Sequence, residues 1–244
     1  MTSRDATQAP AEEDFPPILP GRGASDYERY LRTDELLSLQ KTPAEMGHRD
    51  ELLFQTVHQS CELWLKLACF EAETATGLMG EGELAAAIRL LRRANSAIEI
   101  VVSLMDMLEH MSPWEYTRWI RPVLGHGSGF DSPGFNGVRR VSPELGEAFH
   151  ALRRAAGLSV VELYQRGREH EELYQLAELL TEWDERVTLW RVRHFKVIER
   201  IIGGEVVGTQ GTPVELLEGL IHRRYYPELW QARNELTELA KQAD

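Results

Sequence analysis

The sequence predicts an all-α protein, and three observations support this prediction. Apolar residues recur every three or four positions in segments 50–75, 83–111 and 183–202, as they do on one face of a helix. Proline and glycine are concentrated between these segments, where they end helices. No stretch of the sequence alternates apolar and polar residues over the length of a strand. We therefore expect a helical bundle in one domain over residues 26–244.

The N-terminal region is expected to be irregular. Residues 1–25 contain four of the 11 prolines and an acidic run, so they bury too little apolar surface to become ordered. We expect a disordered arm there, followed by a short amphipathic helix over residues 31–41. Pro43 and Gly47 then interrupt the chain before Asp50, which is placed to cap the helix over residues 50–75.

Capping signals define the helices of the middle region. Ser112-Pro113-Trp114-Glu115 is typical of a helix start with proline at the first helical position. Residues 125–137 contain five glycines and are predicted to be a loop. Ser142 and Pro143 predict a further helix that ends near Gly157.

Capping residues, glycine and proline also define the helices of the C-terminal third. Ser159 and Glu162 form a second capping box, which predicts a long helical stretch that ends at Ile202, with Gly167 as the position where it can be interrupted. Residues 208–213, GTQGTP, predict a second glycine-rich loop. The last helical region begins after this loop and is divided by Pro227.

Composition and charge exclude several classes of partner. The net charge of −12 argues against nucleic acid, which requires a concentrated basic face, and against anionic membranes. Cys61 and Cys69 would stand roughly 12 Å apart on one helix, too far for a disulfide, so we expect two inert buried thiols in a reducing compartment. The sequence has no secretory signal and no run near the roughly 18 apolar residues of a membrane span, which predicts a cytoplasmic protein.

Two of the long helices each carry one histidine in an apolar stripe. His58 follows Phe54 by one helical turn, and His194 follows Trp190 by one turn. Two facing core histidines can bind a metal ion, satisfy each other's polar groups or hold a haem. No HExxH or CxxC motif accompanies them, which disfavours zinc. A neutral imidazole on a rigid helix with apolar surroundings suits haem, but the pattern alone leaves the alternatives open.

Five sequence blocks match one known family in the same order. They are YERYLRTDELLSLQ (27–40), DELLFQTVHQSCELWLKL (50–67), RPVLGHGSGF (121–130), WRVRHFKVIERIIG with GTQGTP (190–213), and RRYYPELWQAR (223–233). The chain resembles the tryptophan 2,3-dioxygenase family of haem enzymes over most of its length, and HQSCELWLK and WRxxH are the most specific matches. The resemblance implies a helical bundle with a b-type haem between helices.

The resemblance also implies roles for residues around the haem. His194 would be the proximal axial ligand of the haem iron, and Trp190 would contact the cofactor. Ser128 matches a residue that lies near a haem propionate. His58 would be the catalytic residue on the distal side, where it would orient the substrate through the indole N–H.

An amino-acid pocket is implied on the distal side. Phe54 and Tyr116 would form its aromatic walls. Arg121 matches the arginine that pairs with the substrate carboxylate, for which a guanidinium fork is suited. Thr209 matches the threonine that, together with a propionate, binds the substrate ammonium.

The N-terminal block implies an assembly. Tyr27 and Tyr30 match a segment that in the family reaches into a neighbouring subunit's pocket. We therefore expect a homo-oligomer, either a dimer or a dimer of dimers.

The implied activity is cleavage of the indole C2–C3 bond of L-tryptophan or a close analogue by O2, as in formation of N-formylkynurenine. One alternative is monooxygenation of tryptophan or a β-methylated tryptophan to a 2-oxindole in secondary metabolism. Another is a haem-binding sensor without turnover, and a cofactor-free helical scaffold is a further alternative.

The alternatives arise because the sequence departs from the family pattern near the substrate. The region between Phe130 and Trp183 is shorter than usual. About one residue is inserted before Arg121, so that counting from Met111 selects Tyr116 as the wall aromatic, while counting back from Arg121 selects Thr117. In addition, Gln210 replaces a usual glycine, and His126 replaces a common proline and would add a titratable group near the pocket.

Overall fold

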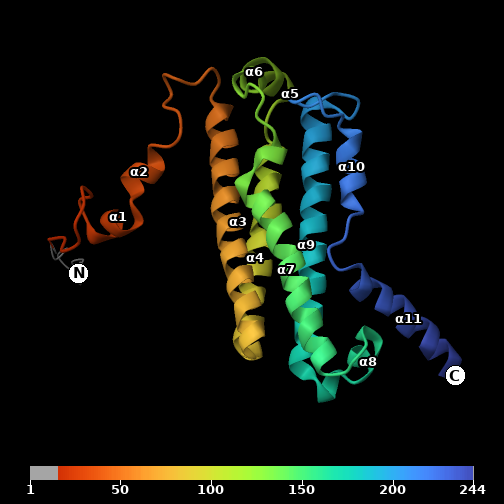
Figure 1. Cartoon of the computed structure of the whole chain (residues 1–244). Helices are drawn as coiled ribbons and strands as arrows, with labels where there is room; N and C mark the ends of the chain where they lie inside the picture. Colours follow the sequence, from red (N-terminus) through yellow and green to blue (C-terminus); the bar gives the residue numbers. More distant parts are fainter. Residues whose placement is uncertain (1–15, 244) are drawn as a thin grey trace, which may run out of the picture. The chain divides into compact units, whose positions relative to one another are not determined.

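The computed structural model describes residues 16–243 (Figure 1), and their secondary structure is helical apart from one isolated β-bridge between Val207 and Pro213. The predicted all-α class is therefore confirmed. The chain divides into two compact units between Glu45 and Met46.

The first unit contains two short helices, α1 (Asp26–Leu31) and α2 (Thr33–Leu37). The single helix predicted over residues 31–41 is wrong, because Arg32 adopts a left-handed conformation (φ 53°) that separates the two helices. Asp26 accepts hydrogen bonds from the backbone N–H groups of residues 18 and 19. Of the predicted N-terminal arm, residues 1–15 lie outside the described part of the chain.

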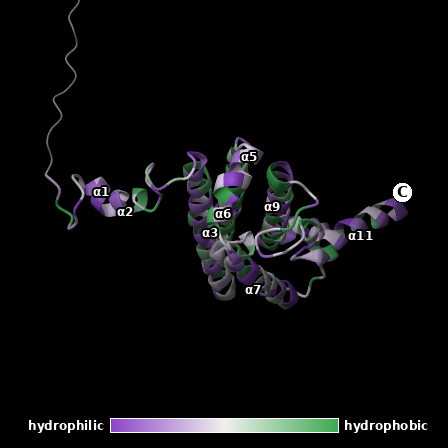
Figure 2. Ribbon diagram, turned by 90° about the horizontal axis from the view of Figure 1, so that it is seen from above, coloured by the Kyte–Doolittle hydropathy of each residue, from purple (hydrophilic) through white to green (hydrophobic). Residues whose placement is uncertain are grey.

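Four long helices, labelled in Figure 1, provide most of the second unit. They are α3 (Asp50–Glu81), α4 (Leu84–Leu108), α7 (Pro133–Ala155) and α9 (Glu171–Ile202). Helix α3 packs against α4 and α7, and α4 also packs against α9. Figure 2 shows hydrophobic and hydrophilic residues interleaved along α3 and α9, as expected for helices with one buried face.

Shorter elements connect and extend these four helices. They are α5 (Pro113–Glu115), the π-helix η1 (Tyr116–Ile120), α6 (Arg121–Val123), the 3-10 turns η2 (Gly129–Asp131) and η3 (Gly167–Glu169), α8 (Val160–Gln165), α10 (Glu215–Ile221) and α11 (Pro227–Ala243). The predicted capping box at Ser159 is present, and Ser112 accepts a hydrogen bond from the N–H of Glu115 as predicted.

The start of α3 differs from the prediction. Asp50 is the first helical residue and does not cap the helix. Instead, Glu51 accepts a hydrogen bond from the N–H of Gly47 (2.7 Å), and His48 Nδ1 accepts one from the N–H of Asp50 (3.2 Å). These side chains satisfy backbone donors at the helix start.

The predicted start of α7 is wrong by ten residues. The helix begins at Pro133, after Ser132 accepts a hydrogen bond from the N–H of Phe135 (3.1 Å), and Pro143 lies inside it. Two of the five glycines that suggested a loop, Gly134 and Gly137, allow α7 to pack closely against α3. A Cβ at Gly134 would lie 2.6 Å from Leu65 Cβ on α3, so a larger residue cannot fit there without a shift.

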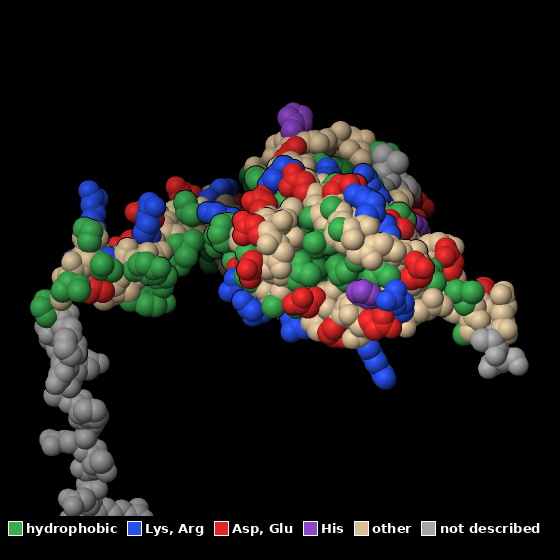
Figure 3. All heavy atoms as spheres, turned by 60° about the horizontal axis from the view of Figure 1, so that its bottom comes forward, with side chains coloured by type: hydrophobic (Ala, Val, Ile, Leu, Met, Phe, Trp, Pro, Cys, Tyr) green, Lys and Arg blue, Asp and Glu red, His purple; other side chains and the backbone are tan. Residues whose placement is uncertain are grey.

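The remaining sequence predictions on thiols and surface can also be compared with the structure. Cys61 and Cys69 are buried, and burial raises the pKa of their thiols to about 12 and about 11, which agrees with inert packing residues. Figure 3 shows acidic and basic side chains intermixed on one face, and Arg140 forms an ion pair with Glu73. Within residues 16–243, no helix combines the length and apolarity that a membrane crossing requires.

Candidate functional site

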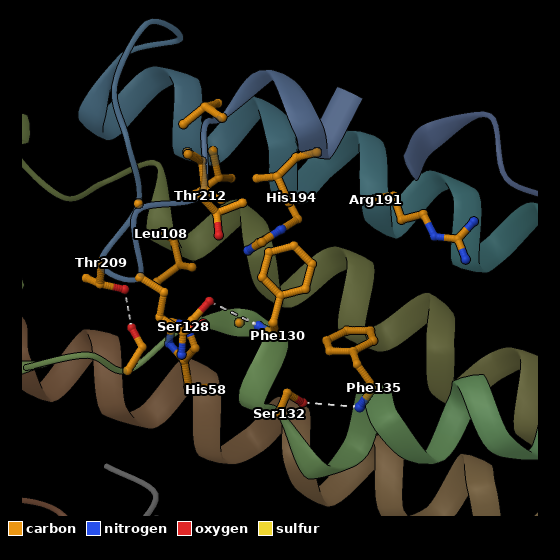
Figure 4. A pocket seen from close by; sticks show the side chains of 18 of the residues that line it. His58, Leu108, Ser128, Phe130, Ser132, Phe135, Arg191, His194, Thr209 and Thr212 are labelled. Carbon is orange, nitrogen blue, oxygen red and sulfur yellow. Dashed lines mark hydrogen bonds between the residues drawn. The ribbon is translucent and has the colours of Figure 1, made fainter. Parts of the chain in front are cut away.

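The second unit contains a cavity of about 420 Å³ where α3, α4, α7 and α9 meet the loops before α7 and after α9 (Figure 4). Eight of the ten predicted site residues line this cavity. They are Phe54, His58, Tyr116, Arg121, Ser128, Trp190, His194 and Thr209. The other two, Tyr27 and Tyr30, belong to the first unit, where their side chains are exposed.

His194 projects from α9 into the cavity. Its ring lies nearly parallel to the Trp190 indole (centroids 5.1 Å apart, 12° between planes), and Trp190 stacks on Phe135 of α7 (3.4 Å). Burial, with a smaller contribution from the nearby His58, lowers the pKa of His194 to about 4. No group in the described part of the chain forms a hydrogen bond to the ring. The imidazole is therefore neutral at physiological pH, and its lone pair is free.

Gly129 keeps the Nε2 edge of His194 open. A Cβ at this position would lie 3.5 Å from Cε1 and 3.6 Å from Nε2 of the imidazole. A side chain at residue 129 would therefore contact the Cε1–Nε2 edge of the ring. The absence of a Cβ leaves that edge open to a ligand.

The Trp190 indole adds an unsatisfied donor at the cavity wall. Its Nε1 is buried and has no hydrogen-bond partner among the described residues. A buried donor without a partner costs free energy, and such groups are rare in folded proteins. An acceptor that entered the cavity beside Trp190 would remove this cost.

His58 faces the same cavity from α3, across from α9 (Figure 4). Its Nδ1 lies 2.7 Å from the carbonyl oxygen of Phe54, one turn earlier, and the rings of the two residues are 4.0 Å apart. A carbonyl oxygen can only accept, so Nδ1 carries the proton and donates it. In the neutral ring, Nε2 is then an acceptor. Burial lowers the pKa of His58, which favours this neutral form.

The π-helix η1 brings an aromatic ring and a cation to the wall of the cavity. Tyr116 and Arg121 are five residues apart, and the N–H of Arg121 donates to the carbonyl of Tyr116, as one π-helical turn requires. One inserted residue in an α-helix produces such a turn. Both Tyr116 and Arg121 consequently line the cavity, and the lining residues do not include Thr117.

Three polar contacts join the loop after α9 to residues 121–131, which precede α7. Arg121 donates to the carbonyl of Val207 (2.6 Å), and Thr209 Oγ1 donates to the carbonyl of Gly127 (2.5 Å; Figure 4). Gln210 Nε2 donates to Asp131 Oδ2 (2.7 Å). These contacts hold residues 207–210 at the edge of the cavity.

Ser128 and Glu62 stabilise the turn directly before α7. Ser128 caps η2, and its N–H donates to Asp131 Oδ2 (3.0 Å). Glu62, from α3, accepts hydrogen bonds from Ser132 Oγ (2.5 Å) and from the N–H of Gly134 (2.8 Å). The carboxylate therefore fixes the position at which α7 begins.

The sequence alone did not identify Phe135 as a site residue, because the glycines of residues 125–137 suggested a loop. The Ser132-Pro133 pair could have revealed the helix start, since it repeats the pattern of Ser112 and Pro113. His126, expected to add a titratable group near the pocket, is exposed and is not among the lining residues.

Comparison with known proteins adds to this geometry. The family model described as tryptophan 2,3-dioxygenase matches residues 18–153. The tryptophan 2,3-dioxygenase of Caulobacter vibrioides is 33% identical over an alignment that covers 86% of this chain and 98% of the relative. Those of Bacillus cereus and Erythrobacter litoralis are each 30% identical, over 86% and 85% of this chain and 92% and 97% of the relatives.

Proposed function

This chain belongs to the tryptophan 2,3-dioxygenase family of oxidoreductases, and we propose that it is a haem-dependent oxygenase that acts on the indole ring of L-tryptophan or a close analogue. One observation supports this proposal above the others. The neutral His194 imidazole has no partner among the described residues, and Gly129 leaves its Nε2 edge open inside a largely apolar cavity.

These residues fit a b-type haem better than a bare metal ion. Among the described residues, no group of three or more His, Cys, Asp or Glu side chains could hold a metal ion. A haem supplies four nitrogen ligands itself and needs only an axial imidazole, which His194 would provide. Ser128 would lie near a propionate, and Trp190 would contact the macrocycle. The iron, when bound, supplies the activation of O2.

His58 would orient the substrate rather than act as an obligatory base. Its Nε2 is the acceptor in the tautomer set by Phe54, so it can accept the hydrogen bond of an indole N–H. Phe54 and Tyr116 provide aromatic walls, with their rings 6.1 Å apart. The apolar walls exclude water from the reacting ring.

The opposite end of the substrate would be bound by the loop contacts. Arg121 can exchange its bond to the Val207 carbonyl for a bidentate pair with a carboxylate. The Thr209 hydroxyl can accept a hydrogen bond from an ammonium group while it donates to Gly127. These two residues would place the amino-acid backbone at the loop and the indole toward His58.

Replacement of His194 tests the cofactor assignment. We expect His194→Ala to purify with less than about a tenth of the haem of the parent protein, since the axial bond is lost. Imidazole added to the medium should restore haem binding by occupying the space of the side chain. Full haem content in His194→Ala would refute the assignment. The exposed His222 provides a control in His222→Ala, which should retain its haem.

Product analysis with ¹⁸O2 tests the reaction. Two labelled oxygen atoms in the product of tryptophan would support dioxygenation to N-formylkynurenine. One labelled atom would support the alternative monooxygenation to a 2-oxindole, for which a reductant must consume the second oxygen atom. A Soret band that does not respond to tryptophan would favour a haem-binding protein without turnover.

We also propose a homo-oligomer in which Tyr27 and Tyr30 reach a neighbouring subunit, and a location in the cytoplasm. The exposed side chains of both tyrosines in the first unit are available for such a contact. Tyr27→Ala should raise the tryptophan Kd without a change in haem content if the residue contributes to a partner's pocket.

A further inference from the structure

The loop after α9 presents a cavity-lining amide side chain that has no role in the proposed function. Gln210 follows Thr209 and lines the cavity with it. Its amide carries both a donor and an acceptor, so its use depends on which atom faces the cavity.

Asp131 determines the orientation of this amide. Gln210 Nε2 lies 2.7 Å from Asp131 Oδ2, and the same oxygen accepts the N–H of Ser128 at 3.0 Å. An ionised carboxylate has no proton to donate, so the amide nitrogen and not the amide oxygen must face it. Gln210 Oε1 is therefore directed away from Asp131, and it has no hydrogen-bond partner among the described residues.

This free acceptor and the nearby Arg121 match the two charged groups of an α-amino acid. Arg121 binds the carbonyl of Val207, three residues before Gln210. One short loop segment thus binds a cationic fork at residue 207 and carries a neutral acceptor at residue 210. An α-amino acid carries its carboxylate and its ammonium on the same carbon atom, so a residue that binds one group brings the other close to the loop.

We propose that Gln210 is a specificity-determining residue whose Oε1 accepts a hydrogen bond from the substrate ammonium, with Asp131 as the positioning residue. The proposal rests on the proposed function, because it requires an amino acid in the cavity. Asp131 is not itself among the lining residues, so its charge acts through the orientation of the amide.

Three ligands distinguish binding of the carboxylate of tryptophan from binding of its ammonium group. L-tryptophan has both groups, tryptamine lacks the carboxylate, and indole-3-propionate lacks the ammonium. Their Kd values are measured by titration of the haem-loaded ferric protein, with the Soret band as the signal. The variants are Gln210→Met, which keeps the side-chain length without the amide, and Asp131→Asn, which removes the constraint on the amide.

We expect Gln210→Met to weaken L-tryptophan and tryptamine by about tenfold, the effect of one charge-assisted hydrogen bond, and to leave indole-3-propionate unchanged. Asp131→Asn should give the same ligand pattern with a smaller loss. Haem content and thermal unfolding of each variant establish that it is folded and loaded.

Two results would overturn the proposal. An equal loss for all three ligands would mean that Gln210 acts on the loop and not on the ammonium, and no loss for tryptophan would remove it from recognition. Failure of the proposed function gives a different result: parent protein whose Soret band responds to none of the three ligands.

Discussion

The two halves of α9 differ in how completely their side chains are buried and paired. In the first half, Trp183 is fully buried and its Nε1 donates to Ser142 Oγ (2.9 Å). The buried carboxylate of Asp184 accepts hydrogen bonds from the N–H of Tyr225 (3.0 Å) and from Trp230 Nε1 (3.0 Å). Around Trp183 and Asp184, this half has the dense packing and hydrogen-bonded polar groups of a stable core.

The second half of α9 faces the cavity instead. Trp190 keeps its buried Nε1 without a partner, and the His194 ring has no hydrogen bond among the described residues. One helix thus contributes to the packed core at its start and to the ligand cavity further along. We infer that substitutions in the first half mainly reduce stability, whereas substitutions in the second half mainly reduce ligand binding.

The largest expected effect is in the packed half. Trp183→Ala removes a fully buried ring and leaves Ser142 without its donor, so we expect a loss of about 3–5 kcal/mol in the free energy of unfolding. The measurement is urea unfolding of the haem-free protein. Trp190→Ala is the matched control in the open half, and it should cost clearly less. Similar losses for the two tryptophans would contradict the division of α9.

Trp183→Ala can prevent folding altogether, so a milder variant is also needed. Trp183→Phe keeps most of the ring and removes the hydrogen bond to Ser142. We expect it to fold and to lose about 1–3 kcal/mol, because the buried hydroxyl loses one partner. Its haem content should equal that of the parent protein.

The apolar stripe of α9 was predictable from sequence in both halves, since Trp190 and His194 line the cavity as expected, but the part of the cavity wall that α7 provides was not. Trp183 and Val187 follow the helical period, and both are buried. Phe135 was missed because Gly134 and Gly137 suggest a loop when read alone. These glycines allow α7 to approach α3 closely. Gly134, for example, packs against Leu65, which lies 69 positions earlier in the chain. Local sequence cannot show such a contact.

The effect of the insertion before Arg121 could be predicted only in part. Residue counting identified one extra residue and two candidates for the wall aromatic, Tyr116 and Thr117. The π-helix accommodates the extra residue and directs Tyr116 to the cavity. The orientation of Gln210 could not be predicted, because it depends on Asp131 across two loops.

A smaller effect is expected from a methyl group beside His194. In Gly129→Ala, the Cβ would lie 3.6 Å from Nε2, so we expect haem affinity to fall by about tenfold or more, while unfolding of the haem-free protein stays within about 1 kcal/mol. Haem transfer to apomyoglobin measures the affinity. Gly77→Ala is the control, since a Cβ there meets no atom within 4 Å. Unchanged haem affinity in Gly129→Ala would show that the Nε2 edge is not the binding position.

The smallest effect concerns the pH dependence of the haem-free protein. The pKa of His194 is lowered from 6.5 to about 4 in the folded state, mainly by burial. As the pH falls from 6.5 toward 4, the unfolded chain binds a proton at this residue and the folded chain does not, so folding becomes less favourable. We expect the parent protein to lose on the order of 1 kcal/mol more stability than His194→Phe between pH 7 and pH 5, with allowance for the part of the ring that solvent reaches. Urea unfolding at the two pH values measures this difference. If both proteins lost the same stability, His194 would titrate normally, and the open half of α9 would not hold a desolvated, neutral imidazole.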